Sequence, residues 1–214
     1  MKRKIVCLGD SVTEGCFELF ATSYGFDTIR DGEHCYAAYL QTMLGDGWEI
    51  INSGVSGNNC RMAKERVEKD VLAHKPEFCV VCLGLNDMTG DLEWHKNHMR
   101  TIFDDLAKSG VKPVLLTPPV ACTYVHPKVG DFAMKAAENI SAAQNAGKLD
   151  GIVESDRLLA KEYGAPVCDF YAFKKAQNIL GRDTTEDLSN YINHPSREEH
   201  KLMAAMLYGI FLNV

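Results

Sequence analysis

The sequence predicts an α/β protein in three layers (α/β/α), with a five-stranded parallel sheet between two layers of helices. Two observations lead to this fold class. Five short runs are apolar on both faces, and they alternate with segments of helical periodicity, a pattern typical of a parallel sheet covered on both sides. The length of 214 residues, with 46% hydrophobic and 24% charged residues, suits a single globular domain over residues 1–214.

The first third of the chain contains two expected strands and the helix between them. Residues 4–8 form an apolar run that ends at Gly9, which predicts the first strand. Residues 36–44 carry apolar side chains at helical spacing and stop at Gly45, and glycine commonly follows the last turn of a helix. Residues 48–51 form the second apolar run, which polar residues and a glycine bring to an end.

The same alternation continues through the middle of the chain. Residues 62–74 predict a charged amphipathic helix, closed by Pro76. Residues 78–83 are apolar throughout and end at Gly84, which predicts the third strand. Residues 93–109 predict a further helix that stops at a glycine.

The last part of the chain completes the sheet. Strands are expected at 111–116, before a Thr-Pro-Pro stretch, and at 166–169, and helices at 151–163 and 196–212. Five such strands predict a doubly wound, flavodoxin-like sheet. Ligands of such sheets bind beyond the carboxyl ends of the strands, so the residues that follow each strand are the candidate site residues.

Two segments are too long for simple connections. Residues 17–33 follow the first strand, and residues 120–149 follow the fourth. Long irregular connections in compact domains are often lids or binding loops. Residues 133–146 are rich in alanine, so part of the second segment is expected to be helical.

Charge and hydropathy limit the expected partners and location. The net charge of −6 argues against a nucleic-acid partner, because phosphate binding needs a basic face. The expected partner is a small or polymeric neutral substrate. No apolar stretch approaches the ~18 residues of a membrane span, and the basic residues 2–4 precede an apolar run too short for a secretory signal. These features predict a soluble, cytoplasmic protein, unless a leader precedes the given chain; they do not indicate its oligomeric state.

Eight cysteines are present, and several lie inside apolar runs. In a chain of this length we expect buried, reduced thiols rather than a disulfide framework. Cys79 and Cys82 form a CxxC pattern, but positions i and i+3 of a strand point to opposite faces and cannot chelate one ion. His95 and His98, on a predicted helix, are expected to be surface residues rather than a metal pair. The sequence therefore predicts neither a metal nor another cofactor.

Ser11 follows the first strand, between Gly9 and Gly15. A tight turn there can present its hydroxyl at the edge of the sheet. The alternative is a capping box, in which Ser11 caps a helix and Glu14 lies three residues on. The two interpretations are compatible, because a helix N-terminus also places backbone N–H groups near a developing oxyanion.

Four further residues carry candidate polar groups after strands or before the last helix. Gly57 follows the second strand and can offer its N–H, since no side chain blocks approach. Asn86 follows the third strand with an amide that can donate to a negative oxygen, and Asp87 can hold the turn. His194 precedes Pro195, so its imidazole is expected on a loop before the last helix.

Together these groups resemble the sequence blocks of the SGNH (GDSL-type) esterase and lipase family. Residues 9–11 (Gly-Asp-Ser) are similar to its first block, Gly57 to its second, residues 84–87 (Gly-Leu-Asn-Asp) to its third, and His194-Pro195 to its last. The resemblance runs from residue 4 to about residue 210. It implies the flavodoxin-like SGNH hydrolase fold and the hydrolysis of esters.

The resemblance also implies a role for each matching residue. Ser11 corresponds to the nucleophile, and His194 to its general base. The N–H groups of Ser11 and Gly57 and the amide of Asn86 correspond to the oxyanion hole. A histidine suits the base because its ordinary pKa lies near neutral pH.

One position departs from the family pattern. The family usually carries an aspartate three residues before the histidine, where this chain has Tyr191. A one-residue bulge would bring Asn190 to the imidazole, and a backbone carbonyl would leave a Ser–His dyad. Asp187 is a further alternative, which we rank below the other two.

The expected substrate is a short acyl ester, such as an acetyl group on a carbohydrate. Two alternatives stay open at this point. A lysophospholipid or an acyl thioester would require a long apolar channel. A binding module with a degenerate site would explain Tyr191 in place of the acid.

Overall fold

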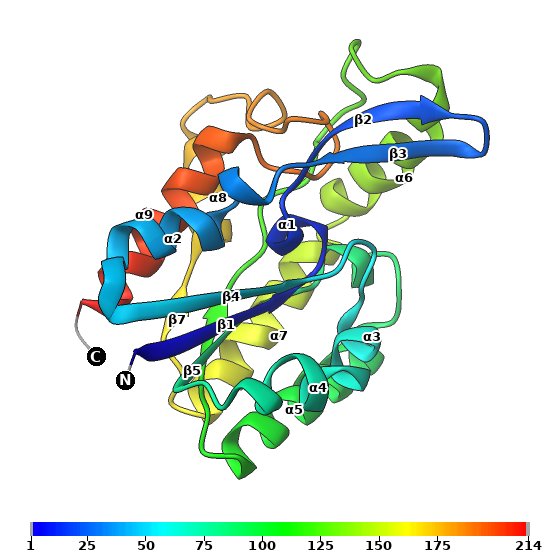
Figure 1. Cartoon of the computed structure of the whole chain (residues 1–214). Coiled ribbons are helices and arrows are strands. Elements are labelled where there is room, and N and C mark those ends of the chain that lie inside the picture. Colours follow the sequence, from blue (N-terminus) through cyan, green and yellow to red (C-terminus); the bar gives the residue numbers. More distant parts are fainter. Residues whose placement is uncertain (1, 213–214) are drawn as a thin grey trace.

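The computed structural model describes residues 2–212 and has the three-layer architecture that the sequence predicts (Figure 1). All neighbouring strands of the main sheet run parallel, in the order β4-β1-β5-β6-β7. This is the flavodoxin-like order. The strands are β1 (Arg3–Gly9), β4 (Trp48–Gly54), β5 (Phe78–Cys82), β6 (Lys112–Leu116) and β7 (Val167–Cys168).

Helices cover both faces of the sheet (Figure 1). One face packs against α2 (Tyr36–Leu44) and α9 (Arg197–Phe211). The other packs against α3 (Cys60–Glu65), α4 (Val67–Asp70) and α5 (Leu92–Lys108). Helix α7 (Lys148–Glu162) lies beside α5 and contributes side chains to both clusters.

The core is divided between the two faces because successive strand side chains alternate. In β1, Ile5 and Cys7 belong to one buried cluster, and Val6 belongs to the other. Cys79 and Cys82 likewise lie in opposite clusters, as the strand spacing predicts. All eight cysteines are buried and free.

The segment 17–33 is not the irregular loop that we expected. It forms an antiparallel hairpin of β2 (Cys16–Thr22) and β3 (Gly25–Arg30), which reaches out over α6 (Met134–Asn145) (Figure 1). Most hairpin residues beyond Phe17 are exposed or only partly buried, so these strands lack the fully buried pattern of the main sheet. Helix α6 confirms the helical expectation for 133–146.

Other boundaries differ in detail. The helix expected at 62–74 is broken into α3, α4 and the 3₁₀ turn η3 (Leu72–His74). The break falls at Arg66, whose guanidinium donates to the carbonyl oxygens of Gly9 and Ser53. The sequence analysis did not predict α8 (Phe170–Ile179), which begins immediately after β7 with Asp169 as its N-cap.

The remaining elements are short. They are α1 (Ser11–Glu14) and the 3₁₀ turns η1 (Gly32–His34), η2 (Gly45–Gly47), η4 (Leu85–Asp87) and η5 (Asp131–Ala133). Among the helices of residues 2–212, none is long and apolar enough to cross a bilayer.

Candidate active site

Ser11 and His194 meet at the carboxyl edge of the sheet. Ser11 opens α1 directly beyond β1, and His194 lies on the loop before α9. The Nε2 atom of His194 lies 3.0 Å from Oγ of Ser11, and both side chains are buried. Residues 183 positions apart in the sequence therefore form one hydrogen-bonded pair.

The turn that presents Ser11 depends on its neighbours. Asp10, and not Ser11, caps α1: its carboxylate accepts the N–H of Val12 at 2.9 Å. The capping box is therefore not formed, and Glu14 accepts the N–H of Ser56 instead. A Cβ on Gly9 would lie 1.9 Å from the Thr13 hydroxyl oxygen, so only glycine lets α1 fold back so closely onto the strand end.

A backbone carbonyl orients the imidazole of His194. Its Nδ1 atom lies 2.9 Å from the carbonyl oxygen of Phe17, in β2. A carbonyl oxygen can only accept a hydrogen bond, so Nδ1 carries the proton and the lone pair of Nε2 faces the Ser11 hydroxyl. This is the tautomer that a general base requires.

The two side chains considered for this role lie elsewhere. Asn190 does not contact the imidazole; its Oδ1 accepts the backbone N–H groups of Ile192, Asn193 and His194, each at 2.9 Å, and so shapes the loop. Asp187 instead pairs with Lys174 and Arg182. Of the three alternatives, the structure forms the contact with a backbone carbonyl.

Tyr191 lies where the family usually has an aspartate, and its side chain contacts other residues. Its backbone is left-handed, with a φ of 56°. Its ring stacks on His126 with centroids 4.2 Å apart, and its hydroxyl accepts from Lys128. The side chain at this position therefore packs against His126 and Lys128.

Phe17 is held in place from the α9 side. The guanidinium of Arg197 lies 4.2 Å from the centre of the Phe17 ring and also pairs with Glu18 and Asp31. Arg197 thus joins the base of the hairpin to the first turn of α9, next to His194. Phe17 is not among the predicted site residues, because a carbonyl contact leaves no residue-type signal.

The predicted oxyanion groups line the same cavity as the pair. Ser11, Gly57, Asn86 and His194 surround a cavity of about 330 Å³. Nδ2 of Asn86 donates to the carbonyl oxygen of Asn58 at 2.9 Å and, over a longer 3.4 Å, to Oδ2 of Asp10. The bond to Asn58 fixes the group, and the hydrogen on the longer bond is the one that can turn to an oxyanion. Gly57 has a φ of 77°, a backbone conformation that favours glycine.

Most of the remaining cavity wall comes from the two long connections and from the loop before α9. Leu19, Phe26 and Thr28 of the hairpin form part of it, with Ile140 of α6 and Ile192. Both segments that were expected to act as binding loops therefore contribute to it. The wall is mainly apolar.

Burial affects two ionisable groups of the site in opposite ways. Burial lowers the pKa of His194, and the hydrogen bond to the Phe17 carbonyl and the charge of Glu14 offset this only in part. Burial also raises the pKa of Asp10 to about 7. Both effects follow from the cost of holding a charged form away from water.

These shifts predict the acid side of the pH profile. A general base must be neutral, so kcat/KM should rise with pH as His194 loses its proton, with a midpoint below the ordinary histidine value of 6.5. Rates of ester cleavage between pH 4 and 9 would measure it. Because Asp10 also titrates, Asp10→Asn is the control, and the midpoint of its kcat/KM profile should likewise lie below the ordinary histidine value. A midpoint above 7 in both proteins would contradict the assignment.

The expectation for His95 was wrong. His95 is fully buried between Asp87 and Asp156, whereas His98, one turn further along α5, is partly buried. The i, i+3 spacing shows that the two rings are close along the helix, but it does not reveal which one faces the core.

A flavodoxin-like sheet with a serine–histidine pair at the carboxyl end of its first strand is the arrangement expected of a class of ester hydrolases. Within that class, the chain belongs to the GDSL-like lipase/acylhydrolase family, whose family model matches residues 7–202. By its description, that family comprises lipases and acylhydrolases, which are carboxylic ester hydrolases.

Individual relatives agree with this family. The chain is 26% identical over 222 residues to an acetylxylan esterase of Xylanibacter ruminicola, covering 95% of the chain and 42% of the relative. It is 34% identical over 91 residues to an acetylxylan esterase of Geobacillus stearothermophilus, covering 40% of each. Both matches thus span less than half of the relative's length.

A solved structure supports the fold. A carbohydrate acetylesterase from Sinorhizobium meliloti superposes with a TM-score of 0.76 at 18% identity, covering 99% of both chains. At that identity the likeness is evidence for the fold alone.

Proposed function

We propose that the chain hydrolyses short acyl esters through an acyl-enzyme intermediate, with Ser11 as nucleophile and His194 as general base. The observation that carries the proposal is the 3.0 Å contact between Ser11 Oγ and His194 Nε2, with Nδ1 of the same ring on the Phe17 carbonyl. A serine hydroxyl is a weak nucleophile until a base takes its proton, and this geometry supports that transfer.

In the proposed first step, Ser11 Oγ attacks the acyl carbonyl carbon while its proton passes to His194 Nε2. The carbonyl oxygen becomes anionic and accepts hydrogen bonds from the N–H groups of Ser11 and Gly57 and from the Asn86 amide. His194 then gives the proton to the departing alcohol oxygen. A water molecule, deprotonated by His194, then attacks the acyl-enzyme carbonyl carbon. The bond from that carbon to Ser11 Oγ breaks, Oγ takes the proton back from His194, and the acid is released.

The missing carboxylate affects the expected efficiency. A neutral carbonyl keeps the productive tautomer of His194, but it stabilises the imidazolium less than a charged aspartate would. Replacing the acid of a triad by an amide can cost ~10⁴ in rate, because the amide favours the wrong tautomer. The Phe17 carbonyl avoids that fault, which argues for an active enzyme rather than a binding module.

The substrate proposal is an acetyl or similarly short acyl group on a carbohydrate or other small alcohol. A cavity of about 330 Å³ is at the small end of the range for ligand sites. The names of the relatives agree with this class. A cytoplasmic location, a neutral substrate and the absence of a nucleic-acid partner stay predictions.

Acyl chain length tests the substrate class. With p-nitrophenyl esters, we expect kcat/KM to be highest for acetate or propionate and to fall at least ~10-fold by octanoate, since the longer chain would not fit the cavity. A preference for chains of eight or more carbons would contradict the proposal and favour the lysophospholipase or thioesterase alternative. A matched series of acetylated sugars would then define the alcohol.

A further inference from the structure

A buried chain of charged groups lies behind the turn that carries Asn86. His95 Nε2 lies 3.0 Å from Oδ1 of Asp156, and His95 Nδ1 lies 3.6 Å from Oδ2 of Asp87. The three side chains are at most 2% exposed. None of them reaches the active-site cavity, so the proposed chemistry does not use them directly.

His95 is the cation of this chain. Burial by itself would lower the pKa of His95, but the hydrogen bond to Asp156 and the ion pair with Asp87 outweigh it and raise the pKa to about 12. The same contacts hold the pKa of Asp87 below its ordinary value despite burial. A buried carboxylate needs such a partner, because an unpaired buried charge is strongly destabilising.

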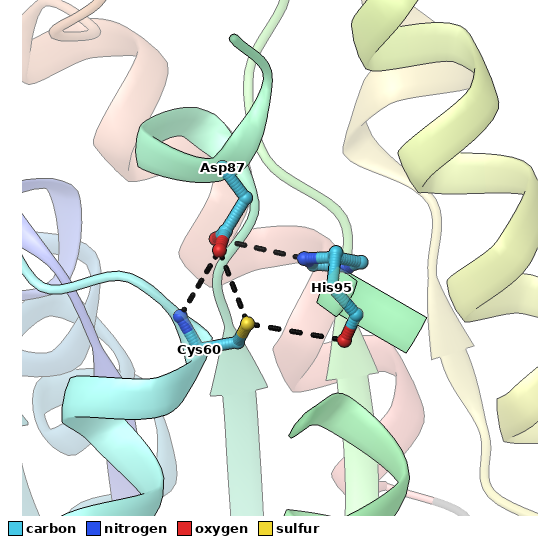
Figure 2. Close-up of side chains that lie close together, drawn as sticks. All are labelled: Cys60, Asp87 and His95. Carbon is cyan, nitrogen blue, oxygen red and sulfur yellow. Dashed lines mark hydrogen bonds and ion pairs between the residues drawn. The ribbon is translucent and has the colours of Figure 1, made fainter. Parts of the chain in front are cut away.

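Asp87 connects the two segments that carry the oxyanion donors. Figure 2 shows its carboxylate between Cys60 and His95: Oδ1 accepts from the N–H of Cys60 at 3.3 Å and from its thiol at 3.0 Å. Cys60 opens α3, two residues beyond Asn58, whose carbonyl accepts from the Asn86 amide. Asp87 thereby ties the Gly57 loop to the Asn86 turn.

The Cys60–Asp87–His95 cluster has residue types that also bind metals. A closed structural zinc site takes four ligands, with cysteine as thiolate. Within residues 2–212, three side chains offer donor atoms here, and burial raises the pKa of the Cys60 thiol to about 11. The geometry is therefore better explained by an ionic chain.

We propose that His95 is a positioning residue for ester hydrolysis. Paired with Asp87 and Asp156, it fixes Asp87, and through Asp87 it holds the Asn86 amide where the oxyanion forms. This inference rests on the proposed function, because His95 acts through the role proposed for Asn86.

A double-mutant cycle tests the proposal. Glutamine can still donate to Asp156 but cannot carry charge, so His95→Gln should lower kcat by roughly 10- to 100-fold, with KM changed by less than about 2-fold. Asn86→Ala alone should lower kcat by ~10²–10³. In the Asn86→Ala background, His95→Gln should lower kcat by less than about 3-fold, because the group that it positions is gone.

The matched control is His98→Gln, on the same helix. His98 contacts Trp94 and lies outside the charged chain, so its kcat should stay at the wild-type value. If His95→Gln does not fold, Asp156→Asn replaces it in the same cycle, since it removes one charge and keeps an acceptor. In that cycle, Asp156→Asn should lower kcat in the protein that retains Asn86, and should lower it by less than about 3-fold in the Asn86→Ala background.

Three results would overturn the proposal. One is an equal fold-loss of kcat from His95→Gln with and without Asn86, which would indicate a general structural role. Another is a wild-type kcat in folded His95→Gln. The third is stoichiometric zinc in the purified protein, whose removal by a chelator lowers Tm. An active Ser11→Ala variant would instead refute the proposed function, so the two failures are distinguishable.

Discussion

Ser11→Ala is expected to lower kcat for p-nitrophenyl acetate by roughly 10⁴- to 10⁶-fold, the range seen when a serine hydrolase loses its nucleophile. The reason is that no acyl-enzyme can form without Oγ. Residual turnover would come from binding and from the oxyanion donors, which the substitution leaves in place. Steady-state and burst kinetics would measure both the loss and the absence of the acyl-enzyme phase.

The fold should survive this change. Ser11 is buried, and alanine removes one oxygen without adding volume, so Tm should stay close to the wild-type value. Ser109→Ala, at the exposed C-cap of α5, is the matched control and should retain full activity. A Ser11→Ala variant with more than about a tenth of wild-type kcat would contradict nucleophilic catalysis by this residue.

His194→Ala is expected to produce a loss of similar size, ~10⁴-fold or more in kcat, because the serine hydroxyl then has no base. The two losses should not add: the double variant with Ser11→Ala should be no slower than either single variant by more than about 10-fold, since the residues act as a unit. Kinetics of the three variants at pH 8 would measure this.

The control for His194 is His74→Ala, which changes an exposed histidine on η3. Its activity should equal that of the wild type. Multiplication of the two single losses in the double variant would show that Ser11 and His194 act independently, which would contradict proton transfer between them.

The fold could be predicted because its strands have a strong signal. Strands such as residues 78–82 are buried on both faces, so every position must be apolar. The hairpin of β2 and β3 could not be recognised in this way, since most of its side chains are solvent-exposed. Helix α8 was not predicted because it follows the two-residue strand β7 after one residue, with no glycine or proline to mark a boundary between them.

Site residues could be predicted where their role depends on the type of side chain. Ser11, Gly57, Asn86 and His194 follow strands or precede a helix, and the topology brings all four to one cavity. For the partner of the His194 ring, the sequence offers a backbone carbonyl, Asn190 and, ranked below these two, Asp187. A carbonyl is present in every residue, so only the three-dimensional fold identifies Phe17. The same holds for His95, whose two acidic partners come from η4 and α7.

Covalent labelling of Ser11 tests the serine–histidine pair most directly. After incubation with a fluorophosphonate, tandem mass spectrometry should locate one adduct on Ser11 in the wild type, in step with loss of activity. In His194→Ala, the rate of labelling should fall at least ~10²-fold, because the imidazole at 3.0 Å no longer activates the hydroxyl. An adduct on another serine that accounts for the lost activity, or labelling of Ser11 in His194→Ala at the wild-type rate, would contradict the pair as the source of catalysis.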